Sequence, residues 1–296
     1  GEAEQLRHDL AGGLRRQVTL VNTVSPSVDS LDIKSFVTEA DASVLVLGRQ
    51  AAGTDTIIDQ AARLHADGLR VRLLLTFYEE WVGKLPISEL QRSSFLFDIS
   101  DVHRTRYRRM ARVMDIAASL LIWPFFLLVL PIVFVGNLIG NRGPLFFRQP
   151  RVGKAGAEFQ IVKLRTMTPG SESTEWTSDA DDRITRFGQI LRRSHIDELP
   201  QLINILRGDI SVVGPRPEQP HYVEQLKASI PFYDLRHIVQ PGLTGWAQVN
   251  YGYGNTTMDA LEKLQYEFYY LRHPSLWLDL QIVARTLQSV IGRKGR

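Results

Sequence analysis

The residues best suited to chemistry lie in one segment, RSHIDELPQLINILRGDISVVGPRP, at residues 193–217. Pro200 precedes QLINILR, which predicts a helix with the proline in its first turn, where a missing N–H costs little. Asp197 then lies at or just before the helix N-terminus and Glu198 in its first turn, where free N–H groups and the positive dipole end favour carboxylates and phosphates. One acid could act as a nucleophile or metal ligand and the other as a base, or both could only cap the helix.

Cationic side chains accompany this segment. Arg216 lies between two prolines that hold its backbone extended, and such a rigid guanidinium fork suits a pair of phosphate oxygens, although it also suits a structural ion pair. The segment GAEFQIVKLRTM predicts a strand on which Lys163 and Arg165 share one face, unless they form only a solvated basic edge. His195 is a candidate proton shuttle or a structural histidine, and the seven histidines show no H-E-x-x-H spacing.

The composition limits the class of protein. The chain has 296 residues, 44% of them hydrophobic and 23% charged, and no cysteine. Disulfide frameworks, iron–sulfur clusters, cysteine-ligated zinc and a thiol nucleophile are therefore excluded. A mean hydropathy of −0.11 excludes a multi-span membrane protein. The net charge of +3 is weakly basic, but the arginines cluster around a hydrophobic run instead of alternating with aromatic residues, which argues against a nucleic-acid partner.

That hydrophobic run, from Ile116 to Asn141, contains no charged residue. About 20 apolar residues suffice to cross a bilayer as a helix, so the run favours a membrane segment over a buried core helix. Basic residues flank it on both sides: Arg104, Arg106, Arg108, Arg109 and Arg112 before it, and Arg142, Arg148, Arg151 and Lys154 after it. A simple span is basic on its cytoplasmic side only, so these flanks predict that both ends lie on the same side.

Pro124 and Pro131 offer a way to turn the chain back within one leaflet. We expect a re-entrant hairpin broken at Pro124, with Ser119 as a partner for the backbone groups that the break frees. A kinked single span is the alternative.

The N-terminal part reads as an α/β unit. Residues 1 to about 16 are polar and compatible with a helix. VTLVNTV, SVLVLG and LRVRLLLTF predict strands, and TDTIIDQAARLHADG predicts a helix that ends at Gly68. Strand, helix and strand joined by short turns are typical of parallel strands. There is no G-x-G-x-x-G loop, so dinucleotide binding has no support.

After the membrane run, we expect a polar loop over residues 168–182 and a helix over residues 183–193 with Asp182 as its N-cap. Asp179, Asp181 and Asp182 are candidate metal ligands or helix caps. PGLTGWAQVNYGYG has the glycine and aromatic content of either a functional loop or a compact turn.

Taken together, residues from about 106 to 292 resemble the bacterial sugar transferases, the monotopic phosphoglycosyl transferases of exopolysaccharide and O-antigen synthesis. The matching motifs, in order, are PLFFRQPRVG, IVKLRTM, DDRITRFGQILRRSHIDELPQL, NILRGDISVVGPRP, PGLTGWAQVN and LDLQIVARTLQSVI. The preceding residues resemble the end of the nucleotide-binding-like domain that larger members carry. Such members also carry a group of N-terminal transmembrane helices. These 296 residues contain no such group, so we expect them to be either a natural short form or a piece of a longer chain.

The resemblance implies a specific reaction. These enzymes transfer a sugar-1-phosphate from a UDP-sugar to undecaprenyl phosphate and release UMP, assisted by Mg²⁺. By this resemblance Asp197, which also serves as a metal ligand, attacks the β-phosphate to form an aspartyl-phosphosugar, and Glu198 helps to deprotonate or orient the lipid phosphate. The candidate phosphate-binding residues are Arg216, Lys163, Arg165 and Arg183. The tyrosines and glycines of residues 251–254 replace an arginine that some smaller members carry, so no sugar is assigned.

The expected fold class is α/β: a partial Rossmann-like N-terminal unit, then a mixed α/β, mainly helical membrane-associated catalytic domain with a re-entrant helix hairpin. The expected boundaries are residues 1–102 for the first unit and its linker, 103–142 for the basic segment and membrane helix, and 143–296 for the catalytic region. The expected location is the cytoplasmic face of the bacterial inner membrane, where basic flanks attract anionic phospholipid. The alternative function is a non-catalytic membrane-anchored scaffold or regulator, and the sequence leaves open whether the chain forms a homo-oligomer.

Overall fold

The computed structural model describes residues 2–11, 18–25, 32–89, 101–168, 170, 181–252, 254 and 256–292, with only the backbone for 101–104 and 291. The chain forms two compact units, which we call unit 1 (Gly1–Phe95) and unit 2 (Leu96–Arg296). The predicted mixed α/β, mostly helical fold is confirmed. Residues 90–100 of the predicted linker and Asp179 of the polar loop lie outside the described residues.

Unit 1 contains a small parallel sheet. Strands β1 (Val44–Leu47) and β2 (Arg70–Leu73) pair in parallel, and helix α4 (Asp55–Ala66) connects them. The predicted strand–helix–strand order is thus confirmed for these elements. The remaining elements of unit 1 are α1 (Glu2–Ala11), α2 (Ile33–Glu39), α3 (Arg49–Ala52), α5 (Leu74–Phe77), the π-helix Tyr78–Val82 and the 3₁₀ helix Ile87–Glu89. Ile33, Ile57 and Leu64 are buried in its core.

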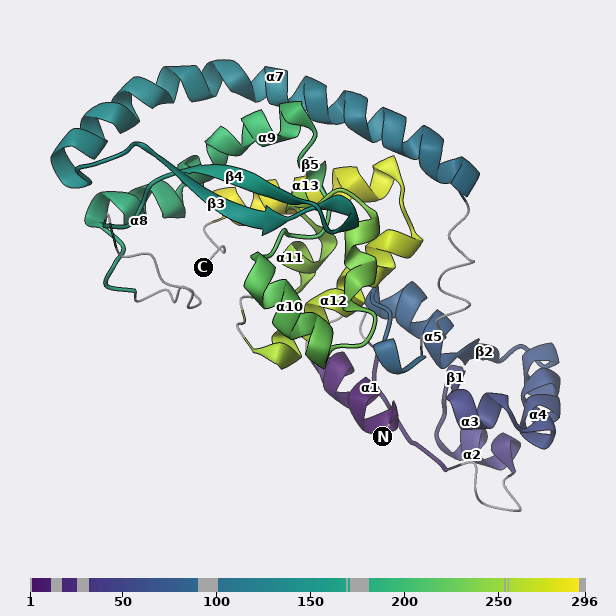
Figure 1. Cartoon of the computed structure of the whole chain (residues 1–296). Coiled ribbons are helices and arrows are strands. Elements are labelled where there is room, and N and C mark those ends of the chain that lie inside the picture. Colours follow the sequence, from purple (N-terminus) through teal and green to yellow (C-terminus); the bar gives the residue numbers. More distant parts are fainter. Residues whose placement is uncertain are drawn as a thin grey trace. The chain divides into compact units, whose positions relative to one another are not determined.

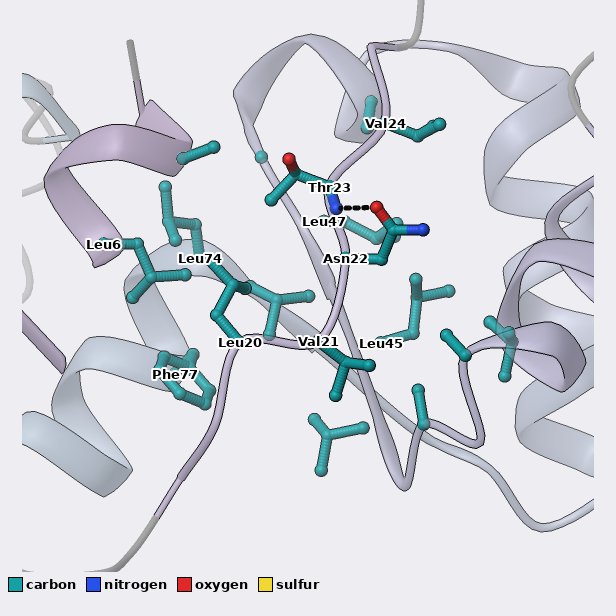
Figure 2. A pocket seen from close by; sticks show the side chains of 18 of the residues that line it. Leu6, Leu20, Val21, Asn22, Thr23, Val24, Leu45, Leu47, Leu74 and Phe77 are labelled. Atoms are coloured by element: carbon teal, nitrogen blue, oxygen red, sulfur yellow. Dashed lines mark hydrogen bonds between the residues drawn. The ribbon is translucent and has the colours of Figure 1, made fainter.

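Two predicted strands of unit 1 were wrong in extent. LRVRLLLTF is a strand only to Leu73 and continues as α5, whose Leu74 and Phe77 are buried. VTLVNTV is irregular: it makes no ladder with β1 among the described residues, and Val21 is 60% exposed. This segment and β1 both line an apolar pocket of about 580 Å³ (Figure 2). A strand exists only through its pairing, so an alternating pattern alone does not make one.

A buried ion pair joins the two ends of unit 1. Lys84 Nζ lies 2.8 Å from Asp9 Oδ1, and the two side chains are 1% and 6% exposed. The hydroxyl of Tyr78 donates to Asp9 Oδ2 at 2.7 Å. Asp9 therefore ties α1 to the chain that follows α5.

We expect Asp9→Asn to destabilise unit 1 by about 3 kcal/mol, because it removes the carboxylate that neutralises a buried ammonium. Hydrogen–deuterium exchange of the full chain should accelerate in residues 2–11 and 78–84. Asp59→Asn, on the exposed surface of α4, is the matched control. Equal exchange in the two variants would contradict this assignment.

Unit 2 is built around one long helix, α7 (Asp101–Gly140), which arches over α9 (Leu202–Arg207) and its neighbours (Figure 1). Strands β3 (Phe146–Val152) and β4 (Glu158–Leu164) form an antiparallel ribbon, and β5 (Ser211–Val213) pairs in parallel with β6 (Gly242–Thr244). The other elements are α8 (Arg186–Arg193), α10 (Pro220–Ser229), α11 (Trp246–Asn250), α12 (Thr257–Arg272), α13 (Leu276–Ile291) and the 3₁₀ helices η3 (Lys154–Gly156), η4 (Ile196–Gln201) and η5 (Tyr233–Ile238).

Helix α7 contacts the rest of unit 2 through one narrow stripe. Its buried residues are Asp115, Ser119, Phe126, Val133 and Asn137, spaced by four or seven positions so that they share one face. Most of its other apolar side chains are exposed, with Leu121 at 82% and Leu128 at 72%. Among the described residues, α7 is the one helix long and apolar enough to cross a membrane. This is the composition of a membrane-associated helix.

The predicted break at Pro124 is absent from the backbone, because α7 continues as a helix through both Pro124 and Pro131. Both prolines are exposed, and the helix that carries them is curved (Figure 1). A proline bends a helix away from its own side, so the helix curves without being interrupted. The predicted role of Ser119 is also wrong, since its buried hydroxyl has no hydrogen-bond partner among the described residues.

Candidate active site

The first turn of η4 carries both acidic candidates. His195, at φ +53°, turns the chain into this 3₁₀ helix, so that Asp197 and Glu198 lie in its first turn as predicted. The predicted α-helix begins only at Leu202, because Pro200 and its neighbours keep the tighter 3₁₀ geometry. Asp197 is buried, at 9% exposure.

An amide side chain fixes η4 and α9 against strand β4. Asn204 on α9 is completely buried, and its Oδ1 accepts from the backbone N–H of Val162 at 3.1 Å. Its Nδ2 donates to the carbonyl of Gln160 at 2.8 Å. Asn204 therefore pairs with β4 as a neighbouring strand would. This fixes where the acidic turn lies relative to Lys163.

Glu198 lies between two cations that are distant in the sequence. Lys163 Nζ donates to its Oε1 at 3.0 Å, and Arg216 Nη2 donates to the same oxygen at 3.4 Å. Burial opposes the charge on Glu198, but Lys163 and Arg216 outweigh that effect and hold the pKa of this carboxyl well below its usual range. Glu198 is therefore a carboxylate that orients two cations.

Lys163 is more buried than Arg216, the other cation that contacts Glu198. Its side chain is 19% exposed, against 39% for Arg216. Burial lowers the pKa of Lys163, and the charge of Glu198 opposes that shift. Lys163 also experiences the charges of Asp197, Arg216 and Arg151, which identifies these five side chains as one electrostatic cluster.

Arg165 does not join this cluster. Strand β4 ends at Leu164, so Arg165 leaves the face that it was predicted to share with Lys163. Its Nε donates to the carbonyl of Pro144 at 2.6 Å and its Nη1 to that of Met167 at 3.0 Å, while its Nη2 donates to the carbonyl of Asn141. These bonds tie the end of α7 to the end of β4.

Arg183 is directed at a neighbouring carboxylate. Its Nε donates to Asp181 Oδ1 at 2.7 Å, and this hydrogen bond lowers the pKa of Asp181. The predicted N-cap was wrong, because α8 begins at Arg186 and the hydroxyl of Thr185 accepts from the N–H of Gly188 at 2.9 Å. Asp182 therefore precedes the helix without capping it.

No group of three or more histidine, aspartate or glutamate side chains that could hold a metal occurs in the described part of the chain. Mg²⁺ is commonly bound by one or two carboxylates together with substrate phosphates. Asp197, the carboxylate of the electrostatic cluster that neither Lys163 nor Arg216 is shown to hold by a hydrogen bond, fits that kind of shared site. Asp181 fits it less well, because Arg183 occupies its carboxylate.

Two further arginines lie beside Arg216, and neither was predicted to be part of the site. Arg151, on β3, donates from Nη1 to the carbonyl of Pro217 at 3.1 Å. Arg236, on η5, donates from Nη2 to the carbonyl of Arg216 at 2.8 Å. Alternation along β3 would place Arg151 with Gln149 on one face, but only the folded chain brings it to the loop that carries Arg216.

Comparison with known proteins identifies the family of the chain. The family described as bacterial sugar transferase matches residues 106–293, which include all but the first five residues of α7, the acidic turn and its cations. The chain belongs to the bacterial sugar transferase family. The family predicted from the sequence motifs is thereby confirmed.

Similar family members have known names. A UDP-N-acetylgalactosamine-undecaprenyl-phosphate N-acetylgalactosaminephosphotransferase of Aeromonas hydrophila is 43% identical over 62% of this chain and 44% of its own length. A UDP-glucose:undecaprenyl-phosphate glucose-1-phosphate transferase of Xanthomonas campestris pv. campestris is 37% identical over 75% of this chain and 46% of its own. An undecaprenyl-phosphate glucose phosphotransferase of Komagataeibacter xylinus is 32% identical over 98% of this chain and 57% of its own. The chain thus spans about half the length of these relatives.

Proposed function

We propose that this chain transfers a sugar-1-phosphate from a UDP-sugar to undecaprenyl phosphate and releases UMP, the first step of a surface polysaccharide. The observation that carries the proposal is the acidic turn of η4, where Asp197 lies next to a carboxylate held by Lys163 and Arg216. The family match and the names of the relatives support the reaction class.

In the first half of the reaction, a carboxylate oxygen of Asp197 attacks the β-phosphorus of the UDP-sugar. The bond from that phosphorus to the bridging oxygen breaks, and UMP leaves with the oxygen. The product is an aspartyl-phosphosugar. Lys163 and Arg216 lie where they can neutralise the charge that develops on the phosphate oxygens.

In the second half, an oxygen of undecaprenyl phosphate attacks the same phosphorus, and the carboxylate of Asp197 is released. Glu198 is a poor base, because its pKa is held below the usual range. Of its two expected roles, deprotonating the lipid phosphate or orienting it, the orienting role is therefore favoured. It acts by holding Lys163 and Arg216 together.

Mg²⁺ bound at this site would neutralise part of the diphosphate charge. Asp197 is the side chain that we propose as its protein ligand, with substrate phosphate oxygens completing the set.

We also propose that α7 enters the membrane from the cytoplasmic face of the inner membrane and returns to the same face. In the first half of α7, just before its uncharged run, Asp115 Oδ1 accepts from the hydroxyl of Ser211 at 2.9 Å and from the N–H of Val212 at 2.8 Å. Near its end, Asn141 Nδ2 donates to the carbonyl of Arg165 at 2.6 Å. Since both anchors belong to unit 2, a span with its ends on opposite sides would tear one of them away.

The length of the anchored segment supports the same conclusion. Asp115 and Asn141 are separated by about 39 Å along a helix, which exceeds the roughly 30 Å thickness of the hydrocarbon core. An upright helix would carry one of the two anchors across the membrane. A curved helix whose convex face lies in the lipid keeps both anchors at the surface (Figure 1). The basic flanks then attract anionic phospholipid at both ends.

Cysteine labelling tests this orientation, and the chain has no native cysteine to interfere. We expect single cysteines at Arg109 and at Arg142 to react with a membrane-impermeant maleimide from the same side of sealed vesicles. Labelling of the two positions from opposite sides would establish a span instead.

Unit 1 is proposed to be part of a Rossmann-like, nucleotide-binding-like domain. The parallel β1–α4–β2 order supports this proposal.

The reaction itself is tested by measuring UMP release from a panel of UDP-sugars with undecaprenyl phosphate and Mg²⁺ in vesicles that contain the full chain. We expect UMP from at least one sugar, and the panel identifies which. No UMP from any sugar with folded protein would favour the alternative, a membrane-anchored scaffold in which the acidic turn only caps a helix.

A further inference from the structure

The loop that carries Arg216 is held by its carbonyl groups. Pro215 and Pro217 have no N–H, so the loop cannot be fixed by donation from these residues. Instead, four consecutive carbonyls accept a hydrogen bond, each from a different donor. The donors are Gly242 N to Pro215 at 2.8 Å, Arg236 Nη2 to Arg216 at 2.8 Å, Arg151 Nη1 to Pro217 at 3.1 Å and Val152 N to Glu218 at 2.9 Å.

The bond to the carbonyl of Arg216 comes from a buried ion pair. Arg236 donates from Nε to Glu267 Oε2 at 2.8 Å and from Nη2 to Glu267 Oε1 at 2.7 Å, and both residues are 5% exposed. Arg236 Nη1 also donates to the hydroxyl of Tyr233 at 2.8 Å. All three guanidinium nitrogens of Arg236 are therefore held by side chains of η5 and α12, and one of them, Nη2, also donates to the loop.

This arrangement fixes the base of the Arg216 side chain. The carbonyl carbon of Arg216 is bonded directly to its Cα, and the flanking prolines restrict rotation on either side. A shift of the carbonyl therefore moves the guanidinium that reaches Glu198. Displacements of about 1 Å near a reacting group can cost about 10²-fold in rate.

We propose that Arg236, held by Glu267, is a positioning residue that fixes the direction of Arg216 toward the substrate phosphates. This inference rests on the proposed transferase function, and it adds a buried pair, Arg236 and Glu267, that acts through the carbonyl of Arg216. Lysine cannot replace Arg236, because only the planar fork can bind Glu267 through two nitrogens and the carbonyl of Arg216 at the same time.

A double-mutant cycle tests this role. It asks whether the fall in kcat/KM caused by Arg236→Lys depends on the Arg216 side chain. A pair that only stabilised the fold would show no such dependence. Arg236→Lys is introduced into the unmutated protein and into the Arg216→Ala variant. UMP release is then measured for all four proteins with the UDP-sugar of the panel that reacts fastest. In the unmutated protein we expect kcat/KM to fall by about 10- to 100-fold. In Arg216→Ala we expect a fall of less than about threefold, because there is no guanidinium left to misplace.

Tyr233→Phe keeps the result interpretable if Arg236→Lys folds poorly. It removes only one of the hydrogen bonds of Arg236, so we expect a smaller loss that again disappears in Arg216→Ala. The matched control is Tyr78→Phe, which removes the hydroxyl of a buried tyrosine in unit 1 that donates to Asp9 at 2.7 Å. It should lower the melting temperature while leaving kcat/KM unchanged.

Equal losses from Arg236→Lys in both backgrounds would overturn the positioning role, since the pair would then act on stability alone. Absence of UMP release from the unmutated protein would overturn the proposed reaction and this inference with it. The two failures are therefore distinguishable.

Discussion

Asp197→Asn should reduce UMP release by about 10³-fold or more, because an amide cannot supply the oxygen nucleophile that forms the acyl-phosphate bond. Asparagine has nearly the same volume and keeps a side-chain oxygen in the first turn of η4, so the fold should be retained. The remaining cations still bind the substrate, and the loss should therefore appear in kcat more than in KM.

Mass spectrometry checks the same assignment without turnover. With a UDP-sugar present and undecaprenyl phosphate left out, the peptide that contains Asp197 should gain the mass of a sugar phosphate, and Asp197→Asn should gain nothing. Asp59→Asn, an exposed substitution in α4, serves as the control and should keep full activity. Full UMP release from Asp197→Asn would exclude Asp197 as the nucleophile.

Membrane binding should be lost when charges are placed on the exposed face of α7. The variant carries Leu121→Asp and Leu128→Asp. Because these side chains are 82% and 72% exposed, the substitutions should not disturb the core of unit 2. An acidic side chain in the hydrocarbon core costs about 2.5–3.5 kcal/mol. Two of them should reduce partitioning into vesicles by about 10³-fold or more.

The measurement is co-sedimentation with vesicles that contain anionic phospholipid. The matched control carries Ile58→Asp and Met258→Asp, two other exposed apolar side chains outside α7, at 43% and 70% exposure. We expect the control to stay with the vesicles. Release of both variants, or of neither, would show that the exposed face of α7 is not the surface that binds lipid.

Features that depend on neighbours along the chain were predictable. The uncharged run predicted α7, because about 25 uncharged and mostly apolar residues in a row are more than a buried helix of a soluble protein usually contains. Alternation predicted β4, and the Pro200 pattern predicted the helical turn that carries Asp197 and Glu198. Both are local effects, set by side-chain period and by the missing N–H of proline.

Features that depend on pairing were predicted less well. VTLVNTV has the alternation of a strand but has no ladder partner in the described part of unit 1. LRVRLLLTF turns into helix α5 because Leu74 and Phe77 have a core to fill. Short apolar runs fit a strand and a helix equally well, and the neighbours decide between them.

By itself, the sequence determined the family, the membrane helix, and the acidic turn with a nearby arginine between prolines. Only the tertiary structure decided which cations serve that turn: Lys163 and Arg216 share one oxygen of Glu198, whereas Arg165 binds carbonyls at the end of α7. It also decided that Arg236 and Glu267 hold the loop of Arg216. The physical reason is that hydrogen bonds and ion pairs depend on distances of about 3 Å in space, which the folded chain sets between residues far apart in sequence.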